Sequence, residues 1–175
     1  GITLADLKLT IRLPDSTAGP SQRGSTLFTH FGVSGPTAMN LSRVITAALS
    51  EETLLIEFDF FPDSTWEETR QHLSQEFKQR PKKQALTILN QQLPQRLCEV
   101  ILGQTQMNYQ QKAGEISRQQ IMNLATALHQ LPVPIVDTLG FKKAEVTAGG
   151  IALHEINSST MESKKQPGLF LAGEI

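Results

Sequence analysis

The spacing of apolar residues changes twice along this chain, and this pattern limits the possible fold more than any other feature of the sequence. The first apolar residues recur at every second position, the period of a half-buried β-strand: Leu7, Leu9, Ile11 and Leu13. In the middle third of the chain the period becomes 3.6 residues, as in an amphipathic helix. Short apolar runs return after Pro132. The chain therefore reads as β, then α, then β.

Three strands and one helix are predicted in the first sixty residues. In chain order, we expect a strand at 7–13, a turn-rich loop at 14–24, a short strand at 25–29, a helix from Pro36 to about Val44 and a strand at 54–60. Pro36 suits the first turn of a helix, with Ser34 or Gly35 as the N-cap. The first two strands should form an antiparallel hairpin with a long tip.

Four short helices are predicted between residues 62 and 131. Ser64 and Glu67 have the spacing of a capping box, and the helix that follows them should end at Pro81. A second helix carries the apolar residues of 86–93, and a third begins near Pro94 and ends at Gly103. A second capping box, Ser117 with Gln120, opens the fourth helix.

These elements predict an α+β fold. The simplest architecture is a small antiparallel β-barrel or sheet built from both ends of the chain, residues 1–61 and 132–175, with a helical subdomain inserted at 62–131. Strand signals in the last part of the chain lie at 135–136, 144–146, 151–153 and 169–171. No initiator Met is present, and the C-terminus is an apolar run, so we expect a fragment of a longer protein.

The charge balance argues against a nucleic-acid partner for the chain as a whole. The sequence has 16 Lys and Arg residues against 17 Asp and Glu residues, a net charge of -1. Proteins that bind nucleic acid by counterion release are usually basic, so any such contact would have to be local. One local candidate is the run Lys78, Arg80, Lys82 and Lys83, although such runs are more often solvated turns between helices.

Cysteine and histidine usage indicates neither a disulfide nor a metal site. The single cysteine, Cys98, cannot form an internal disulfide, which fits a reducing cytoplasm. No Cys/His set has the spacing of a metal site, and His72 and His129 are interpreted as helix-surface residues. No apolar run approaches the ~20 residues of a membrane span.

Three short segments have the character of binding turns. Residues 29–36 direct backbone N–H groups and a helix N-terminus at one point, which suits an anion or a polarised carbonyl, but an ordinary strand-to-helix turn explains them equally well. The Thr147–Gly150 turn allows close approach to the backbone, as does a tight hairpin. The run 169–174 ends in a carboxylate that can accept a hydrogen bond from a ligand hydroxyl, but a strand followed by a turn is the commoner explanation. A hydrolase built on Ser34 and His30 is rejected, because Pro36 stands where a nucleophile elbow needs glycine.

Together these segments resemble one known family in order and spacing. The matching stretches are residues 27–36, 146–151, 160–164 and 167–174. They are similar to the BaiN-type, aminoacetone-oxidase-like bacterial FAD-dependent flavoproteins. In that family an FAD-binding region of Rossmann type is interrupted by an inserted module, and this chain looks like the insert plus the first returning strands.

The resemblance implies roles for particular residues. Glu174, with Ala172 and Gly173, would bind the ribityl chain of FAD, and Thr147, Gly149 and Gly150 would face the isoalloxazine. A substrate-side turn would comprise Thr29, Gly32, Ser34 and Gly35, with His30 as a proton donor or acceptor.

The chain lacks the G-x-G-x-x-G fingerprint that holds a dinucleotide phosphate. FAD should therefore belong to the parent protein, an oxidoreductase with a small-molecule substrate and an NAD(P)H link, in which this module caps the flavin. The missing FAD-binding domain would be its partner, and the fragment alone should bind no cofactor and be inactive. The competing hypothesis is a protein- or ligand-binding interaction module without redox activity.

Overall fold

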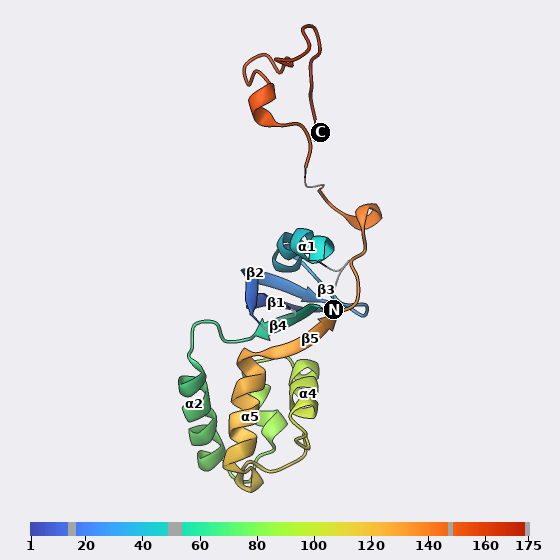
Figure 1. Cartoon of the computed structure of the whole chain (residues 1–175). Helices are drawn as coiled ribbons and strands as arrows, with labels where there is room; N and C mark the ends of the chain where they lie inside the picture. Colours follow the sequence, from blue (N-terminus) through green and yellow to red (C-terminus); the bar gives the residue numbers. More distant parts are fainter. Residues whose placement is uncertain (14–16, 49–53, 147–148, 174–175) are drawn as a thin grey trace. The chain divides into compact units, whose positions relative to one another are not determined.

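The computed structural model describes residues 1–13, 17–48, 54–146 and 149–173, and it has an α+β fold (Figure 1). By internal contacts the chain divides into two units, Gly1–Asp137 and Thr138–Ile175. The first unit contains a five-stranded antiparallel sheet and the helical block. The α+β class and the antiparallel sheet flanking inserted helices are confirmed.

The sheet has the strand order β3-β2-β1-β4-β5. Its strands are β1 (Ile2–Arg12), β2 (Ala18–Phe28), β3 (Val33–Ser34), β4 (Leu54–Asp59) and β5 (Leu131–Ile135). All four pairings are antiparallel. The alternation that predicted the first strand is confirmed, because Leu7, Leu9 and Ile11 are fully buried.

The expected turn-rich loop at 14–24 is wrong over its described part, because β2 begins at Ala18. Ser21 pairs with Thr10 and Arg23 pairs with Lys8 on β1. The backbone hydrogen bonds to β1 override the turn preferences of the glycines, prolines and serines in this segment. The register shifts by one residue between Leu4 and Leu7, and Gly24, the partner of Leu7 on β2, has φ of 150°.

Helix α1 (Pro36–Ala48) packs on β2 and β1. Its buried residues are Thr37, Leu41 and Ile45. Of the two candidate caps, Gly35 is the one the structure selects, because its carbonyl accepts a hydrogen bond from Met39 N at 2.9 Å.

Four helices form the block between β4 and β5, as predicted. They are α2 (Trp66–Gln79), α3 (Ala85–Leu89), α4 (Gln95–Gln104) and α5 (Arg118–His129), with a 3-10 turn η1 (Ala113–Glu115) before the last. The Ser117–Gln120 capping box is confirmed. The first box is shifted by one residue: Thr65 caps α2 and Glu68 closes the box, not Ser64 with Glu67. Both candidate pairs have the same spacing, so spacing could not distinguish them.

The second unit contains two short 3-10 turns, η2 (Phe141–Lys143) and η3 (Leu153–Glu155). Isolated bridges join Ile156 to Ser163 and Glu162 to Phe170. Among the described residues of this unit, the strands expected at 144–146, 151–153 and 169–171 are therefore wrong. An apolar run shows that a segment can be buried, but a strand also needs a hydrogen-bonded neighbour. The grouping of 132–175 with 1–61 in one β-rich subdomain stays a prediction.

Candidate functional site

A polar pocket lies where the outer face of the sheet meets the helical block. It has a volume of about 310 Å³. The lining residues are Lys8, Thr10, Arg12, Ala18, Glu57, Asp59, Trp66, His129 and Gln130. The side chains from β1 and β4 alternate with the core residues of the same strands, so one face of the sheet is apolar and the other carries charge.

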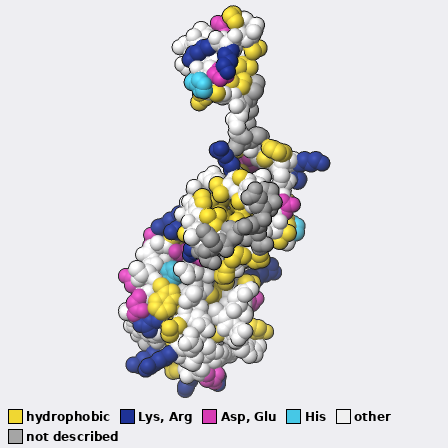
Figure 2. Space-filling model, in the orientation of Figure 1, with side chains coloured by type: hydrophobic (Ala, Val, Ile, Leu, Met, Phe, Trp, Pro, Cys, Tyr) yellow, Lys and Arg dark blue, Asp and Glu magenta, His cyan; other side chains and the backbone are white. Residues whose placement is uncertain are grey.

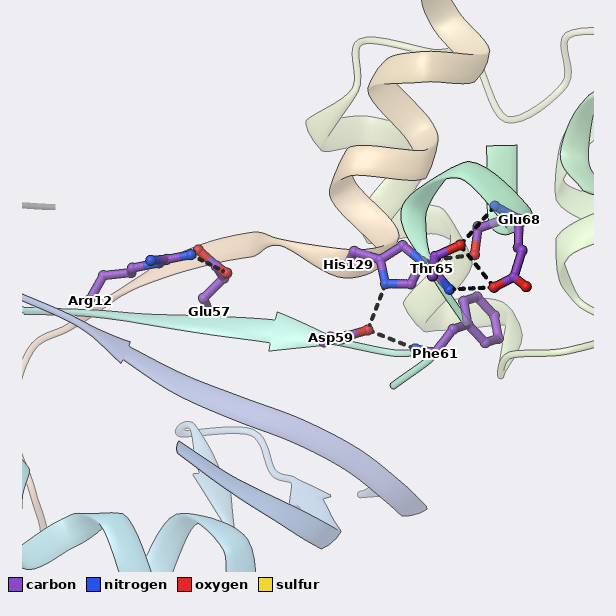
Figure 3. A network of polar contacts seen from close by, with 8 residues as sticks. Arg12, Glu57, Asp59, Phe61, Thr65, Glu68 and His129 are labelled. Carbon is purple, nitrogen blue, oxygen red and sulfur yellow. Dashed lines mark hydrogen bonds and ion pairs between the residues drawn. The ribbon is translucent and has the colours of Figure 1, made fainter. Parts of the chain in front are cut away.

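Asp59 and His129 line this pocket, and with Thr69 they form a hydrogen-bonded chain, of which Figure 3 shows the contact between Asp59 and His129. Asp59 Oδ1 lies 2.9 Å from His129 Nδ1, and Thr69 Oγ1 lies 2.7 Å from His129 Nε2. A carboxylate only accepts hydrogen bonds, so Nδ1 carries the proton, and in a neutral ring Nε2 accepts from the Thr69 hydroxyl. Asp59 Oδ1 also accepts from Phe61 N at 3.1 Å.

The interpretation of His129 as a helix-surface residue is wrong, because only 9% of it is exposed. It is the last residue of α5, and at this point the helix touches the sheet: Phe60 N donates to Leu128 O at 2.9 Å. His72, in contrast, is exposed and contacts Gln92 through Nε2.

The order hydroxyl–imidazole–carboxylate matches that of a hydrolase triad, but here the hydroxyl belongs to a buried residue of a helix. Thr69 is 7% exposed and belongs to the first turn of α2, where its backbone N–H donates to Thr65 O. The three residues come from α2, α5 and β4. Their arrangement therefore ties two helices to the end of β4, which lies between β1 and β5 in the sheet.

A second polar pair lines the same pocket. Arg12 donates through Nε and one terminal nitrogen to the two carboxylate oxygens of Glu57, at 2.7 and 3.0 Å. Both side chains are partly buried, and the paired carboxylate raises the pKa of Arg12 above its ordinary value. The pair bridges β1 and β4 and leaves Lys8 as a cation of the pocket without a recorded ion pair among the described residues.

The sequence-predicted substrate-side turn is an ordered connection between β2 and β3. Thr29 N donates to Gly32 O at 2.8 Å and the Thr29 hydroxyl donates to the same oxygen at 3.0 Å. Gly32 and Gly35 both have positive φ, 151° and 89°. His30 is exposed at the tip, where its ring meets Phe31 edge-on at 4.9 Å. Ser34 belongs to β3.

The predicted flavin-contacting residues lie in the second unit or outside the described residues. Gly149, Gly150, Ala172 and Gly173 are exposed, and the three glycines have positive φ. Thr147 and Glu174 lie outside the described residues. The turn at 29–35 and these residues belong to separate units, so the roles assigned to both sets stay predictions.

Sequence reasoning missed the Asp59–His129–Thr69 chain. One signal was available: Thr69 precedes Leu73 and Phe77 at intervals of four, so it occupies the buried stripe of its helix. A polar residue on such a stripe needs a buried partner. The sequence could not name that partner, because Thr69 and His129 are 60 residues apart.

No helix among the described residues is both long and apolar enough to cross a membrane. Within the same residues, no cluster of three His, Cys, Asp or Glu side chains is arranged to hold a metal ion.

Comparison with known proteins relates this chain to one protein family. The model of the HI0933-like protein barrel and H2TH domain matches residues 1–146. A ribosomal RNA dihydrouridine synthase of Haemophilus influenzae is 32% identical over 157 residues, which cover 90% of this chain and 37% of the relative. The protein of the same name in Escherichia coli is 32% identical over 155 residues, which cover 87% and 36%.

A third relative has a different name. The 3-dehydro-bile acid delta(4,6)-reductase of Clostridium scindens is 29% identical over 153 residues, which cover 87% of this chain and 37% of the relative. The chain thus spans little more than a third of the length of the curated relatives it matches. The resemblance found in the sequence is confirmed by these matches. The chain belongs to the HI0933-like family, and its residues 1–146 correspond to the barrel and H2TH domain of that family.

Proposed function

We propose that this chain is the barrel and H2TH module of a FAD-dependent oxidoreductase of the bacterial cytoplasm, and that it packs against the FAD-binding part and shapes the substrate pocket over the flavin. The observation that carries the proposal is the pair of relatives' names. One relative makes dihydrouridine and another is a reductase, so both names describe the addition of hydrogen to a substrate. A module shared by reductases with such different substrates is expected to serve the common redox chemistry.

The exposed apolar surface of the second unit supports the proposal that another part of the full-length protein packs against it. Large apolar side chains between 138 and 173 are exposed: Leu139, Phe141, Val146, Leu153, Met161, Leu169 and Phe170. None of the described residues of this unit is buried. Apolar surface of this kind is favourable only when it is covered. The FAD-binding part of the same protein is the occupant we propose.

The chain's own residues can supply part of a FAD site. A side chain added at Gly149 or Gly173 would meet nothing within 4 Å, so a ligand can reach the backbone there. The sequence has no dinucleotide phosphate loop, and the pyrophosphate must be held elsewhere. Gly149, Gly150 and Gly173 would then approach the isoalloxazine and ribityl groups, and the sequence resemblance adds Thr147 to the first contact and Glu174 to the second.

The bound flavin would supply hydride transfer, and the module would position the substrate, exclude water and move a proton. His30 is the group we assign to the proton. It is exposed at the tip of an ordered turn, where a substrate can reach it.

For the substrate we propose a uridine of ribosomal RNA. Two of the three relatives described above carry that activity in their names, and both are 32% identical to this chain. The expectation of a small-molecule substrate without nucleic acid rested on the net charge of the whole chain, whereas RNA contacts depend on the local charge. A small molecule such as a steroid acid is the second candidate, favoured by the third relative.

The test compares this chain with the full-length protein that contains it. We expect only the full-length protein to show the visible absorption of bound flavin. Incubated with a reductant and unmodified ribosomal RNA, it should yield a nucleoside heavier than uridine by two hydrogens in mass spectrometry. A full-length protein that takes up no FAD would refute the redox proposal and favour an interaction module. A flavoprotein that leaves ribosomal RNA unchanged but reduces an unsaturated steroid acid would favour the second substrate.

The role of His30 has a test of its own in the full-length protein. His30→Ala should slow substrate reduction while the flavin spectrum stays unchanged. His72→Ala is the control, since His72 is exposed on α2 and contacts Gln92. Equal turnover in the wild type and His30→Ala would remove His30 from the mechanism.

A further inference from the structure

We infer that the end of the helical block away from the sheet binds the RNA backbone. This surface, which we call the helical tip, consists of Lys78, Lys82, Lys83, Lys112, Arg118 and Tyr109. The inference deepens the proposed function and rests on it for the identity of the substrate. It assigns the contacts with the RNA backbone to the helical tip, and not to the pocket or to the turn at 29–35.

Backbone hydrogen bonds hold the turns of the helical tip side by side. Ala113 N donates to Lys83 O at 2.8 Å, and Gly114 N donates to Pro81 O at 3.0 Å. Gln84 and Lys112 form an isolated bridge. Residues about thirty positions apart in the sequence are therefore fixed next to each other, which makes one surface of two short segments.

The cations of this surface have no partner that neutralises them within the described residues. Lys78, Lys82, Lys83, Lys112 and Arg118 are all exposed and take part in none of the recorded ion pairs. Arg80 differs, because it pairs with Glu76 at 3.2 Å. Unpaired exposed cations are available to phosphate groups, and they release counterions when they bind them.

The charge is concentrated locally. Segments 76–84 and 108–118 together contain six Lys or Arg residues and two Glu residues, a net charge of +4, whereas the whole chain carries -1. The opposite end of the helical block, residues 59–68, contains four acidic residues and no Lys or Arg, and two of the four are paired, Asp63 with Arg23 and Glu67 with Arg70. Helix α2 separates the two ends by about 20 Å, the length of its 14 residues at 1.5 Å each. An RNA chain is therefore attracted to the helical tip, where the cations are unpaired.

Figure 2 shows Lys and Arg side chains projecting from the end of the helical block that lies away from the sheet. The acidic end of the block adjoins the polar pocket, since Asp59 lines it. We therefore place the phosphate contacts at the helical tip and not at that pocket.

Tyr109 adds a feature that simple anion binding would not need. Its side chain is 50% exposed, and it lies two residues before Gln111, whose carbonyl accepts a hydrogen bond from Ala85 N at 3.0 Å. An exposed aromatic ring among cations can stack on an unpaired base while the cations contact the backbone. The combination favours RNA with unpaired bases over a membrane surface.

The experiment measures binding of the full-length protein to a short fluorescein-labelled hairpin of ribosomal RNA, by anisotropy over a series of KCl concentrations. For Lys82→Ala/Lys83→Ala we expect the dissociation constant to rise on the order of tenfold, with the log–log salt slope reduced by about 0.7 for each lost phosphate contact. Tyr109→Leu should weaken binding several-fold with little change in the salt slope. The matched control is Lys142→Ala/Lys143→Ala, another exposed adjacent pair, which should bind as the wild type does.

Three results would overturn the inference: tip variants that bind like the wild type, a control pair that weakens binding equally, or tip-dependent binding to phosphatidylserine vesicles in place of RNA. The far-UV circular dichroism spectrum of each variant reports whether it has folded. Lys82→Gln/Lys83→Gln replaces the alanine pair if that spectrum is lost, with the same expected result.

Failure of the inference and failure of the proposed function are distinguishable. A protein that binds FAD and reduces RNA equally well with and without the tip cations would refute the inference alone. A protein that binds RNA through the tip but carries no flavin would refute the redox proposal and leave the inference standing. Where both hold, loss of the tip cations should raise KM for RNA and leave kcat unchanged.

Discussion

His129 and Asp59 are 70 residues apart in the sequence, yet His129 Nδ1 lies 2.9 Å from Asp59 Oδ1. The contact joins the last residue of α5 to the last residue of β4. Thr69 of α2 completes it through His129 Nε2. The helical block is thus attached to the sheet by a largely buried polar chain in addition to apolar packing, and Asp59 and His129 of that chain also line the outer pocket.

Loss of the Thr69 hydroxyl should destabilise the protein. Thr69→Val keeps the volume and leaves His129 Nε2 buried without its partner, which we expect to lower the free energy of unfolding by about 1–3 kcal/mol. Urea denaturation followed by circular dichroism measures this. Thr46→Val, on the exposed face of α1, is the control and should change stability by less than about 0.5 kcal/mol. Equal stability of the two variants would contradict a supporting role for the chain.

The position of the α2 cap can be tested by two neighbouring substitutions. Thr65 Oγ1 accepts from Glu68 N, so Thr65→Ala should cost about 1 kcal/mol of stability. Ser64→Ala should cost much less, because Ser64 does not cap the helix. Thermal or urea unfolding of the two variants decides between the structure and the cap expected from the sequence. A larger loss in Ser64→Ala would favour the sequence-based cap.

Glu67 should titrate at unusually low pH. Hydrogen bonds from Arg70 and then Gln71 lower the pKa of its carboxyl to about 2. Because the folded-state pKa is lowered, the stabilisation is complete above the ordinary carboxyl range and is lost as the pH falls towards 2. Carboxyl-carbon NMR of the wild type and Arg70→Ala measures the effect, and the pKa of Glu67 should rise in the variant. An unchanged titration would exclude Arg70 as the cause.

Two glycines should respond in opposite ways to alanine. Gly35 has φ of 89°, and an added Cβ would lie 3.2 Å from Leu27 N and Ser25 O, so Gly35→Ala should destabilise by about 1–3 kcal/mol. Gly103 is an open position in α4, where alanine is the better helix former, so Gly103→Ala should stabilise by about 0.5–1 kcal/mol. Chemical denaturation of both variants checks the pair. A stable Gly35→Ala would show that the β3–α1 turn can relax.

Cys98 should be chemically inert in the native protein. Its thiol is fully buried, and burial raises the pKa to about 11. Because the thiolate is the reactive form, iodoacetamide at mildly alkaline pH should label Cys98 slowly in native protein and rapidly in urea. Mass spectrometry of timed samples follows the reaction. Rapid native labelling would mean that α4 opens frequently.

The correct predictions from sequence came from local, repeated signals. The period-2 pattern of β1 and the period-3.6 pattern of the helical block each repeat over several turns or residue pairs, so single exceptions do not hide them. The Ser117–Gln120 box was correct, whereas the Ser64–Glu67 box was one residue early. Two equivalent spacings competed there, and only the backbone hydrogen bond from Glu68 N to the Thr65 hydroxyl shows which one caps.

The sequence by itself determined the fold class, the insertion of helices between strands and the family, because these depend on periodicity and on ordered motifs within short windows. Only the tertiary structure decided that β2 begins at Ala18, that His129 is buried on Asp59 and Thr69, and that Lys112 lies beside the 80–84 turn. Each of these depends on which distant segment supplies the partner. The free energy of pairing two segments depends on the residues of both, so it cannot be inferred from the sequence of either segment alone.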